Sequence, residues 1–452
     1  MVRVPAHARV ELDNGAVLIL LPRRDVPLVA CQVFLRGGAC GDPPALPGVA
    51  SLVAALLEKG AGPRDAYAFA EAVEGAGGSF TAAAGPEAIA VRSQFMARDQ
   101  GLMLELLGDA LRAPRLASEE FMSLRDRQIE FIKAVKDSEP AELLDAYGRA
   151  LLFAEHPYGR AVHGSESSLA AITPAHVRAY YRAHFGADRL LLVLAGDIDV
   201  DRAEAAVRAA FSAWPRAPAP LVPPAPLGTR PATRRTLLID APGATQSHFW
   251  IGAPGVPKNY PQRAALDLVN TLFGGRFTSL LNAELRIKSG LSYGARSGFV
   301  RGSAGGDFSI RSFVETAETG RAIRLALQAL ARLQGDGVSA EMLRSARAYT
   351  LGQYALGLET AADWAAALAE IEFFGLGTGY IDDYPEQLAA VDPQAARAVI
   401  AAAFPDPRDT VLVVIADAAR ISGQLDEFGP VLHMRLTDTQ FNPTTGANPE
   451  LS

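Results

Sequence analysis

Cysteine is scarce in this sequence. Only Cys31 and Cys40 occur, which is too few for a disulfide framework or for a zinc or iron–sulfur site built from cysteines. No uninterrupted run of about 18 apolar residues is present, which excludes an ordinary transmembrane helix. Positive charge is not in excess either. The 43 Lys and Arg residues against 50 Asp and Glu give a formal net charge of −7, which argues against a nucleic-acid partner.

The chain also lacks recognisable targeting and serine-hydrolase signals. Its start, Met1-Val2-Arg3, has no cationic leader followed by an apolar run. A leader that had been cleaved off would leave a similar start, so the compartment stays open: periplasmic if a leader was removed, otherwise cytoplasmic. No Gly-x-Ser-x-Gly nucleophile motif occurs. The abundance of Ala and Arg is consistent with a bacterial source of high genomic G+C.

What is present is the composition of a folded protein of two or more domains. The 452 residues are 49% hydrophobic and 21% charged, as in ordinary globular proteins. Between Pro215 and Pro231, 7 of 17 residues are proline, which favours an extended, semi-rigid connection. We therefore expect an N-terminal half over residues 1–214, a linker over 215–233, a C-terminal half over 234–436 and a flexible tail over 437–452.

Each half reads as strands, then helices, then a closing strand, which indicates an α+β fold. The halves also end alike. Thr173-Pro174 and Asp392-Pro393 each place a capping residue before a proline at the first helical position, and each predicted helix is followed by an apolar strand. A duplicated unit of about 200 residues explains this match best. Two unrelated domains that end alike are the alternative.

Several segments lie in a characteristic order along the chain. They are Arg36–Asp42, Pro47–Ala61, Glu74–Ala82, His156–Gly164 and Ala195–Ile198. In this order they resemble the insulinase-like zinc peptidase family, whose members include pitrilysin-type and mitochondrial-processing-peptidase-like proteins. The resemblance runs from about Val10 to Asp417. It implies two related halves, each a mostly antiparallel sheet with helices packed on one face, that enclose a chamber.

In active members of that family, the helix matching residues 48–60 carries His-x-x-Glu-His. Positions i and i+4 share a helix face, so two imidazoles can reach one zinc ion beside the glutamate that acts as general base. Alignment with this pattern places Ser51, Ala54 and Ala55 at the three positions. A serine hydroxyl is a poor zinc ligand, and a methyl group offers neither a ligand nor a base. We therefore expect this motif to be inactive.

Other candidate metal ligands are weak. The family's third ligand, a glutamate, matches a position near Ile132, and Glu130 lies close by but out of register. No two of the seven histidines lie three or four residues apart. His156 and His163 flank a turn-rich segment, and a structural role on loop backbone is favoured over metal binding. We expect no cofactor in this chain and expect zinc in a partner subunit.

Residues 273–294 resemble the C-terminal signature of the same family, a helix that ends in Leu-Arg followed by Gly-Leu-x-Tyr. Its Arg and Tyr match Arg286 and Tyr293. The resemblance implies that both contact the substrate backbone beside the scissile bond. A guanidinium and a phenol can each donate a hydrogen bond to an oxygen on which negative charge develops. Without the resemblance, Arg286 is a favourable charge at a helix C-terminus and Tyr293 is a core residue.

These observations favour the non-zinc-binding subunit of a two-chain metallopeptidase. A homologous partner with an intact His-x-x-Glu-His motif would supply the zinc, while this chain supplies Arg286 and Tyr293 and has no peptidase activity alone. A peptide substrate would pair with an exposed sheet edge through its backbone. One alternative is a structural or peptide-binding homologue without a catalytic role, and another is catalysis by this chain through displaced ligands.

Overall fold

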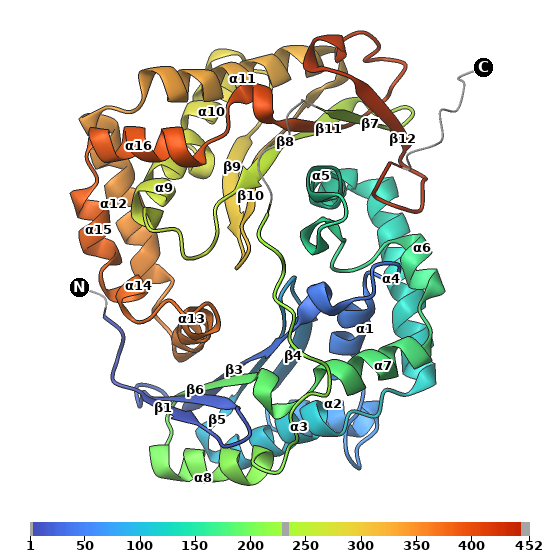
Figure 1. The fold of residues 1–452 in the computed structure, drawn as a ribbon, viewed down its shortest axis with the longest axis vertical. Helices are drawn as coiled ribbons and strands as arrows, with labels where there is room; N and C mark the ends of the chain where they lie inside the picture. The colour runs from blue at the N-terminus through green and yellow to red at the C-terminus, as the bar shows by residue number, and fades with distance from the viewer. Residues whose placement is uncertain (1–2, 228–234, 444–452) are drawn as a thin grey trace. The chain divides into compact units, whose positions relative to one another are not determined.

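The computed structural model describes residues 3–227 and 235–443, and two six-stranded sheets organise them (Figure 1). Sheet 1 contains, in spatial order, β1 (Ala8–Glu11), β2 (Val17–Pro22), β6 (Leu190–Gly196), β3 (Leu28–Arg36), β5 (Ala88–Met96) and β4 (Ser79–Ala84). Sheet 2 contains β12 (Val431–Arg435), β7 (Thr236–Asp240), β11 (Val411–Ala416), β8 (Gln246–Gly255), β10 (Gly306–Glu315) and β9 (Ala295–Arg301).

The two sheets repeat one topology over five strands. In sheet 1, β2 pairs in parallel with β6, and the pairs β6–β3, β3–β5 and β5–β4 are antiparallel. Strands β7, β11, β8, β10 and β9 repeat this order and these directions in sheet 2. Only the sixth strand differs, because β1 runs antiparallel to β2 whereas β12 runs parallel to β7. The predicted α+β fold of two related halves is confirmed.

The helices repeat as well. Three helices follow the last hairpin of each sheet: α3 (Gln100–Arg112), α4 (Ser118–Ser138) and α5 (Leu144–Phe153) in the first half, and α11 (Thr319–Asp336), α12 (Ala340–Leu356) and α13 (Ala361–Phe373) in the second. The remaining α-helices are α1 (Val49–Leu56), α2 (Ala66–Gly75), α6 (Glu166–Ala171), α7 (Pro174–His184), α8 (Val200–Phe211), α9 (Arg263–Asn270), α10 (Leu280–Asn282), α14 (Gly379–Asp382), α15 (Tyr384–Ala390) and α16 (Pro393–Ala403).

The matching ends of the halves begin with the predicted caps. At α16, the Asp392 carboxylate accepts a hydrogen bond of 2.7 Å from the backbone N–H of Ala395. At α7, the backbone N–H of Thr173 donates to Nδ1 of His176 over 3.2 Å. Both helices carry proline at their first position, where a missing N–H costs nothing. The closing strands β6 and β11 then follow, and every residue of each is buried.

The compact units of the fold are not continuous in sequence. The first unit contains the residues up to Phe131, Val162–Pro223 and Gln353–Tyr384, so it includes α13 from the second half. The second unit contains Ile132–Ala161, Pro224–Gly352 and the residues from Pro385 on, so it includes α5 from the first half. The third helix after the hairpin in each half therefore belongs to the sheet of the other half.

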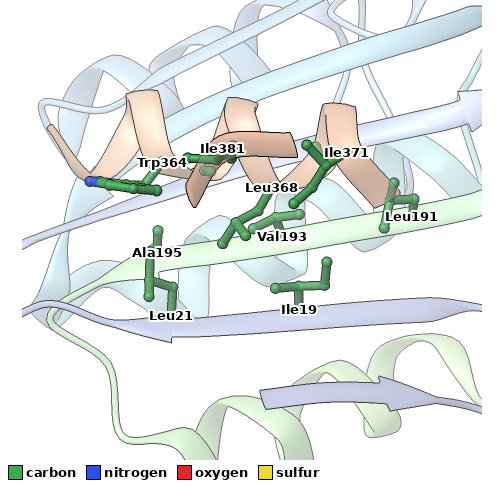
Figure 2. Close-up of a cluster of buried hydrophobic side chains, with 11 residues drawn as sticks. Ile19, Leu21, Leu191, Val193, Ala195, Trp364, Leu368, Ile371 and Ile381 are labelled. Carbon is green, nitrogen blue, oxygen red and sulfur yellow. The ribbon is translucent and has the colours of Figure 1, made fainter. Parts of the chain in front are cut away.

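Helix α13 lies on sheet 1 through an apolar cluster (Figure 2). The cluster joins Trp364, Leu368 and Ile371 of α13 to alternate residues of the interior strands β2 and β6. Side chains alternate between the faces of a strand, yet all seven residues of β6 are buried, so both faces of this strand are covered. Arg36 of β3 adds a hydrogen bond of 3.0 Å from Nη1 to the carbonyl oxygen of Phe373, at the C-terminus of α13.

Helix α5 packs on β8 and β11 of sheet 2 at very close range. A Cβ atom added at Gly148 would lie 2.6 Å from the ring of Trp250, which is fully buried, so only glycine fits there. The next residue, Arg149, donates from Nε to Oδ2 of the buried Asp307 on β10 over 3.0 Å. Burial raises the pKa of the Asp307 carboxyl. Helix α5 is therefore held against sheet 2 by the close approach that Gly148 permits and by the ion pair between Arg149 and the buried Asp307.

The linker and tail predictions fall partly outside the described residues. Residues 215–227 form neither helix nor strand, and the rest of the predicted linker to residue 233 is not described. Of the predicted tail, residues 437–443 are described, and Phe441 is buried with its ring 5.0 Å from that of Tyr147. Residues 444–452 are not described. No described helix combines the length and the hydropathy needed to cross a membrane.

Candidate functional site

Helix α1 follows strand β3 in the first unit and is fixed at its start by Asp42. The two carboxylate oxygens of Asp42 accept hydrogen bonds of 2.8 Å from the backbone N–H groups of Gly48 and Ala50. An acidic group at this end also complements the helix dipole. The helix ends at Leu56, and Gly60 beyond it has a φ of +98°, a value that glycine tolerates. It is shorter than the predicted span of residues 48–60.

The three motif positions on α1 lie in an apolar setting. Ala54 is fully buried, whereas Ser51 and Ala55 are half-buried. Ser51 Oγ and His163 Nδ1 share a hydrogen bond of 3.0 Å. Burial lowers the pKa of the His163 imidazole, which favours its neutral form. This face of the helix therefore presents a neutral hydroxyl–imidazole pair and two methyl groups.

Two other positions considered for metal binding are buried in the core or hydrogen-bonded to the backbone. Ile132, at the position of the third ligand, is 4% exposed on α4. Nδ1 of His156 accepts from the backbone N–H of Tyr158 over 3.1 Å, so Nε2 carries the proton and donates to the carbonyl oxygen of Ala225 over 2.8 Å. The structural role expected for this histidine is confirmed. Within residues 3–227 and 235–443, no group of three His, Cys, Asp or Glu residues could hold a metal ion.

In the second unit, the segment that follows α9 is irregular. Residues Thr271–Gly275 and Ala283–Lys288 are π-helical, with the three-residue α10 between them. π-Helical segments are rare in proteins, and those that occur are often found at functional sites. Asn282 ties the segment to sheet 2, because its Oδ1 accepts from the backbone N–H of Ala295 on β9 over 2.9 Å. Leu285 is fully buried and anchors the turn that carries Arg286.

Arg286 contacts two exposed aromatic rings. Its Cζ is 4.7 Å from the ring centroid of Phe277 and 5.5 Å from that of Tyr293, and its Nη1 donates to the carbonyl oxygen of Tyr293 over 2.7 Å. Tyr293 is 80% exposed and Phe277 is 59% exposed. The interpretation of Tyr293 as a core residue is therefore wrong. Stacking on aromatic faces holds a guanidinium in place without using its hydrogen-bond donors.

The donors of this cluster are available. Among the described residues, Nε and Nη2 of Arg286 and the hydroxyl of Tyr293 have no hydrogen-bond partner. The nearby carboxylate of Glu284 pairs with Lys288 over 2.6 Å and with Arg332 over 3.1 Å. The hydrogen bond from Lys288 is the main reason that the pKa of Glu284 is lowered. We call Phe277, Arg286 and Tyr293 the arginine cluster.

Two members of this cluster, Arg286 and Tyr293, are predicted from the sequence. Phe277 is not, because an exposed phenylalanine has no periodicity or motif that separates it from a core residue. The proximity of Phe277 to Arg286 follows from the irregular backbone between them. The hydrogen bond between Ser51 and His163 is likewise not predictable from spacing, because the two residues are 112 positions apart.

Two family models match the chain. Residues 18–166 match the model described as "Insulinase (Peptidase family M16)", and residues 171–349 match the model described as "Peptidase M16 inactive domain". A protein named an uncharacterized zinc protease from Streptomyces coelicolor is 26% identical over 396 residues, which cover 86% of each chain. A protein of the same kind of name from Mycobacterium leprae is 26% identical over 364 residues, which cover 80% of this chain and 82% of that one.

Solved structures share the fold. The crystal structure of a peptidase M16 inactive domain from Pseudomonas fluorescens has a TM-score of 0.84 at 23% identity and covers 91% of this chain and 98% of that one. The crystal structure of a protease from Helicobacter pylori has a TM-score of 0.82 at 18% identity and covers 91% of this chain and 99% of that one. At these identities the likeness concerns the fold alone.

Proposed function

The chain belongs to the insulinase family of peptidases, family M16, and from this premise we propose that it is the subunit without zinc in a two-chain metallopeptidase. In this proposal a homologous partner carries His-x-x-Glu-His and the zinc. This chain supplies Arg286 and Tyr293 as hydrogen-bond donors to the peptide carbonyl that is attacked.

One observation carries the proposal: the two candidate regions differ in their chemistry. The motif positions of α1 hold a serine and two alanines, which cannot bind zinc or activate water. The arginine cluster has exposed donors, and Arg286 is already oriented by Phe277 and Tyr293. Donors that are positioned before the reaction stabilise a developing oxyanion without reorganisation. They assist a nucleophile that another chain must generate.

The substrate in this proposal is a peptide contacted mainly through its backbone. A guanidinium and a phenol recognise a carbonyl oxygen whatever side chain follows it, which suits tolerance of sequence. Phe277 adds an apolar surface beside the donors, where a substrate side chain can rest. A carboxylate near the scissile bond would compete with the carbonyl for Arg286, so we expect acidic residues there to slow cleavage.

The test is reconstitution. The chain is mixed with its purified partner, and hydrolysis of a fluorogenic peptide is measured with and without chelator. We expect activity from the mixture only, loss of this activity with chelator, and strong reductions with Arg286→Ala and with Tyr293→Phe. Unchanged activity of the two variants would reject the catalytic contribution. Stable association without hydrolysis would instead favour the structural or peptide-binding homologue.

A further inference from the structure

Strand β4 is an edge of sheet 1, because β5 is its only partner within the described part of the chain. In an antiparallel strand, successive residues direct their N–H and C=O groups alternately toward the neighbouring strand and away from it. The backbone N–H of Ala82 donates to Oε1 of Glu58 over 2.5 Å, so Ala82 faces away from β5. By alternation, Phe80 and Ala84 face away as well.

This edge has little protection of its own. Its sequence, Ser-Phe-Thr-Ala-Ala-Ala, contains no charged residue and no proline, and its register with β5 runs from Ser79 opposite Gln94 to Ala84 opposite Ile89 without a bulge. Edge strands are normally protected by charge, proline or a bulge, because their unpaired backbone groups accept another strand. The small side chains of Ala82 to Ala84 also leave room for a neighbour.

Glu58 supplies the protection from outside the strand. It lies two residues beyond the end of α1, and it is half-buried. Burial raises the pKa of its carboxyl, while the hydrogen bond from Ala82 acts in the opposite direction. A desolvated carboxylate that accepts a backbone N–H forms a strong, charge-assisted bond. Ala82 is the middle one of the three outward-facing residues of β4. Its backbone N–H is therefore already hydrogen-bonded to the Glu58 carboxylate of the same chain.

We propose that Glu58 closes the β4 edge against extended peptide. The partner excluded is a polypeptide segment in β conformation, whose backbone would pair with the outward groups of Phe80, Ala82 and Ala84. This inference concerns the first unit and does not depend on the role of Arg286 and Tyr293. It means that the β4 edge of sheet 1 is closed, which leaves β1 as the other edge of this sheet, so the peptide contacts of the chain fall to surfaces other than β4.

The first measurement is hydrogen–deuterium exchange of the segment that contains residues 79–84. Glu58→Ala removes the acceptor, and we expect the Ala82 amide to exchange about tenfold faster or more. Glu58→Gln is the matched control, because its amide oxygen can still accept this bond, and we expect a change of about threefold or less. Equal exchange in all three proteins would overturn the proposal. Glu58→Leu, which fills similar space without an acceptor, replaces Glu58→Ala if that variant does not fold.

The second measurement is peptide binding by fluorescence anisotropy. The probe is a fluorescein-labelled octapeptide. It has a lysine at each end and six alternating threonine and valine residues between them. We expect Glu58→Ala to bind it at least about tenfold more tightly than the wild-type chain or Glu58→Gln. Adding Ala82→Pro to Glu58→Ala should abolish the gain, because proline removes the outward N–H and is tolerated on a strand edge.

Three results would overturn the proposal at this stage. The first is equal affinity of the wild-type chain and Glu58→Ala for the peptide. The second is a gain in affinity that survives Ala82→Pro, which would place the peptide elsewhere. The third is dimerisation of Glu58→Ala in light scattering without peptide binding, which would make a second copy of the chain the occupant. None of these results bears on reconstituted peptidase activity, so the two proposals can fail separately.

Discussion

Helix α1 and the arginine cluster both lie between the second and third strands of their repeats, which are β3 and β4 in the first half and β8 and β9 in the second. The side chains of these two regions differ in how deeply they are buried. Ala54 is fully buried, and the packing of the first unit depends on it. Tyr293 is 80% exposed, and the half-buried Arg286 contacts two exposed rings and donates to one carbonyl, so neither side chain lies in the buried core. Residues that are positioned but not needed for packing are the better candidates for function.

The largest expected effect comes from returning an acidic group to α1. Ala54→Glu places a carboxylate at a fully buried position without a partner, and we expect the free energy of unfolding to fall by about 3–5 kcal/mol. Urea denaturation measures it. Ala55→Glu is the control, because this position is half-buried, and it should cost about 1 kcal/mol or less. Equal losses of unfolding free energy at the two positions would contradict the deeper burial of Ala54 relative to Ala55.

The second prediction concerns Arg286 and separates activity from stability. In the two-chain assay, Arg286→Ala should lower kcat about 100-fold, as the loss of one preorganised donor does. The free energy of unfolding of the chain alone should change by less than about 0.5 kcal/mol, because Arg286 lies outside the buried core and the two rings it contacts are exposed. A large loss of stability with the same loss of kcat would show that Arg286 has a structural role.

The third prediction concerns Phe277, which orients Arg286 without donating to it. Phe277→Leu removes the aromatic face 4.7 Å from the guanidinium and should lower kcat/KM about three- to fivefold, in line with an exposed cation–π contact. Phe277→Tyr keeps the ring and should restore most of the activity. If leucine and tyrosine behave alike, the ring has no orienting role.

The smallest effect is a dependence of stability on pH. Burial lowers the pKa of His163 below its usual value, so the folded chain binds this proton less readily than the unfolded chain. Stability from this residue is present above about pH 6.5 and is lost as the pH falls toward the folded pKa. His163→Gln should remove that loss. Thermal unfolding between about pH 7 and about pH 5 checks it, and identical slopes for both proteins would contradict the assignment.

The sequence predicted a large part of the fold because the relevant signals are local. Proline after a capping residue marked the starts of α7 and α16, and the apolar runs after them marked β6 and β11. The candidate site was predictable in part for a similar reason, since Arg286 and Tyr293 lie seven residues apart in one signature. The exchange of α5 and α13 was not predictable. An apolar helix face indicates that the helix packs against another element, but it does not indicate which sheet that element is.

By itself, the sequence determined that α1 carries no histidine, cysteine or carboxylate and that the chain repeats one α+β unit, because the chemistry of a side chain and the periodicity of a segment do not depend on distant contacts. Only the tertiary structure decided that Phe277 stacks on Arg286, that Ser51 meets His163 and that Glu58 occupies an amide of β4. These contacts join residues 9, 112 and 24 positions apart, along irregular or distant paths through the fold. No rule of spacing encodes such contacts, because they arise from how packed helices and sheets place their edges.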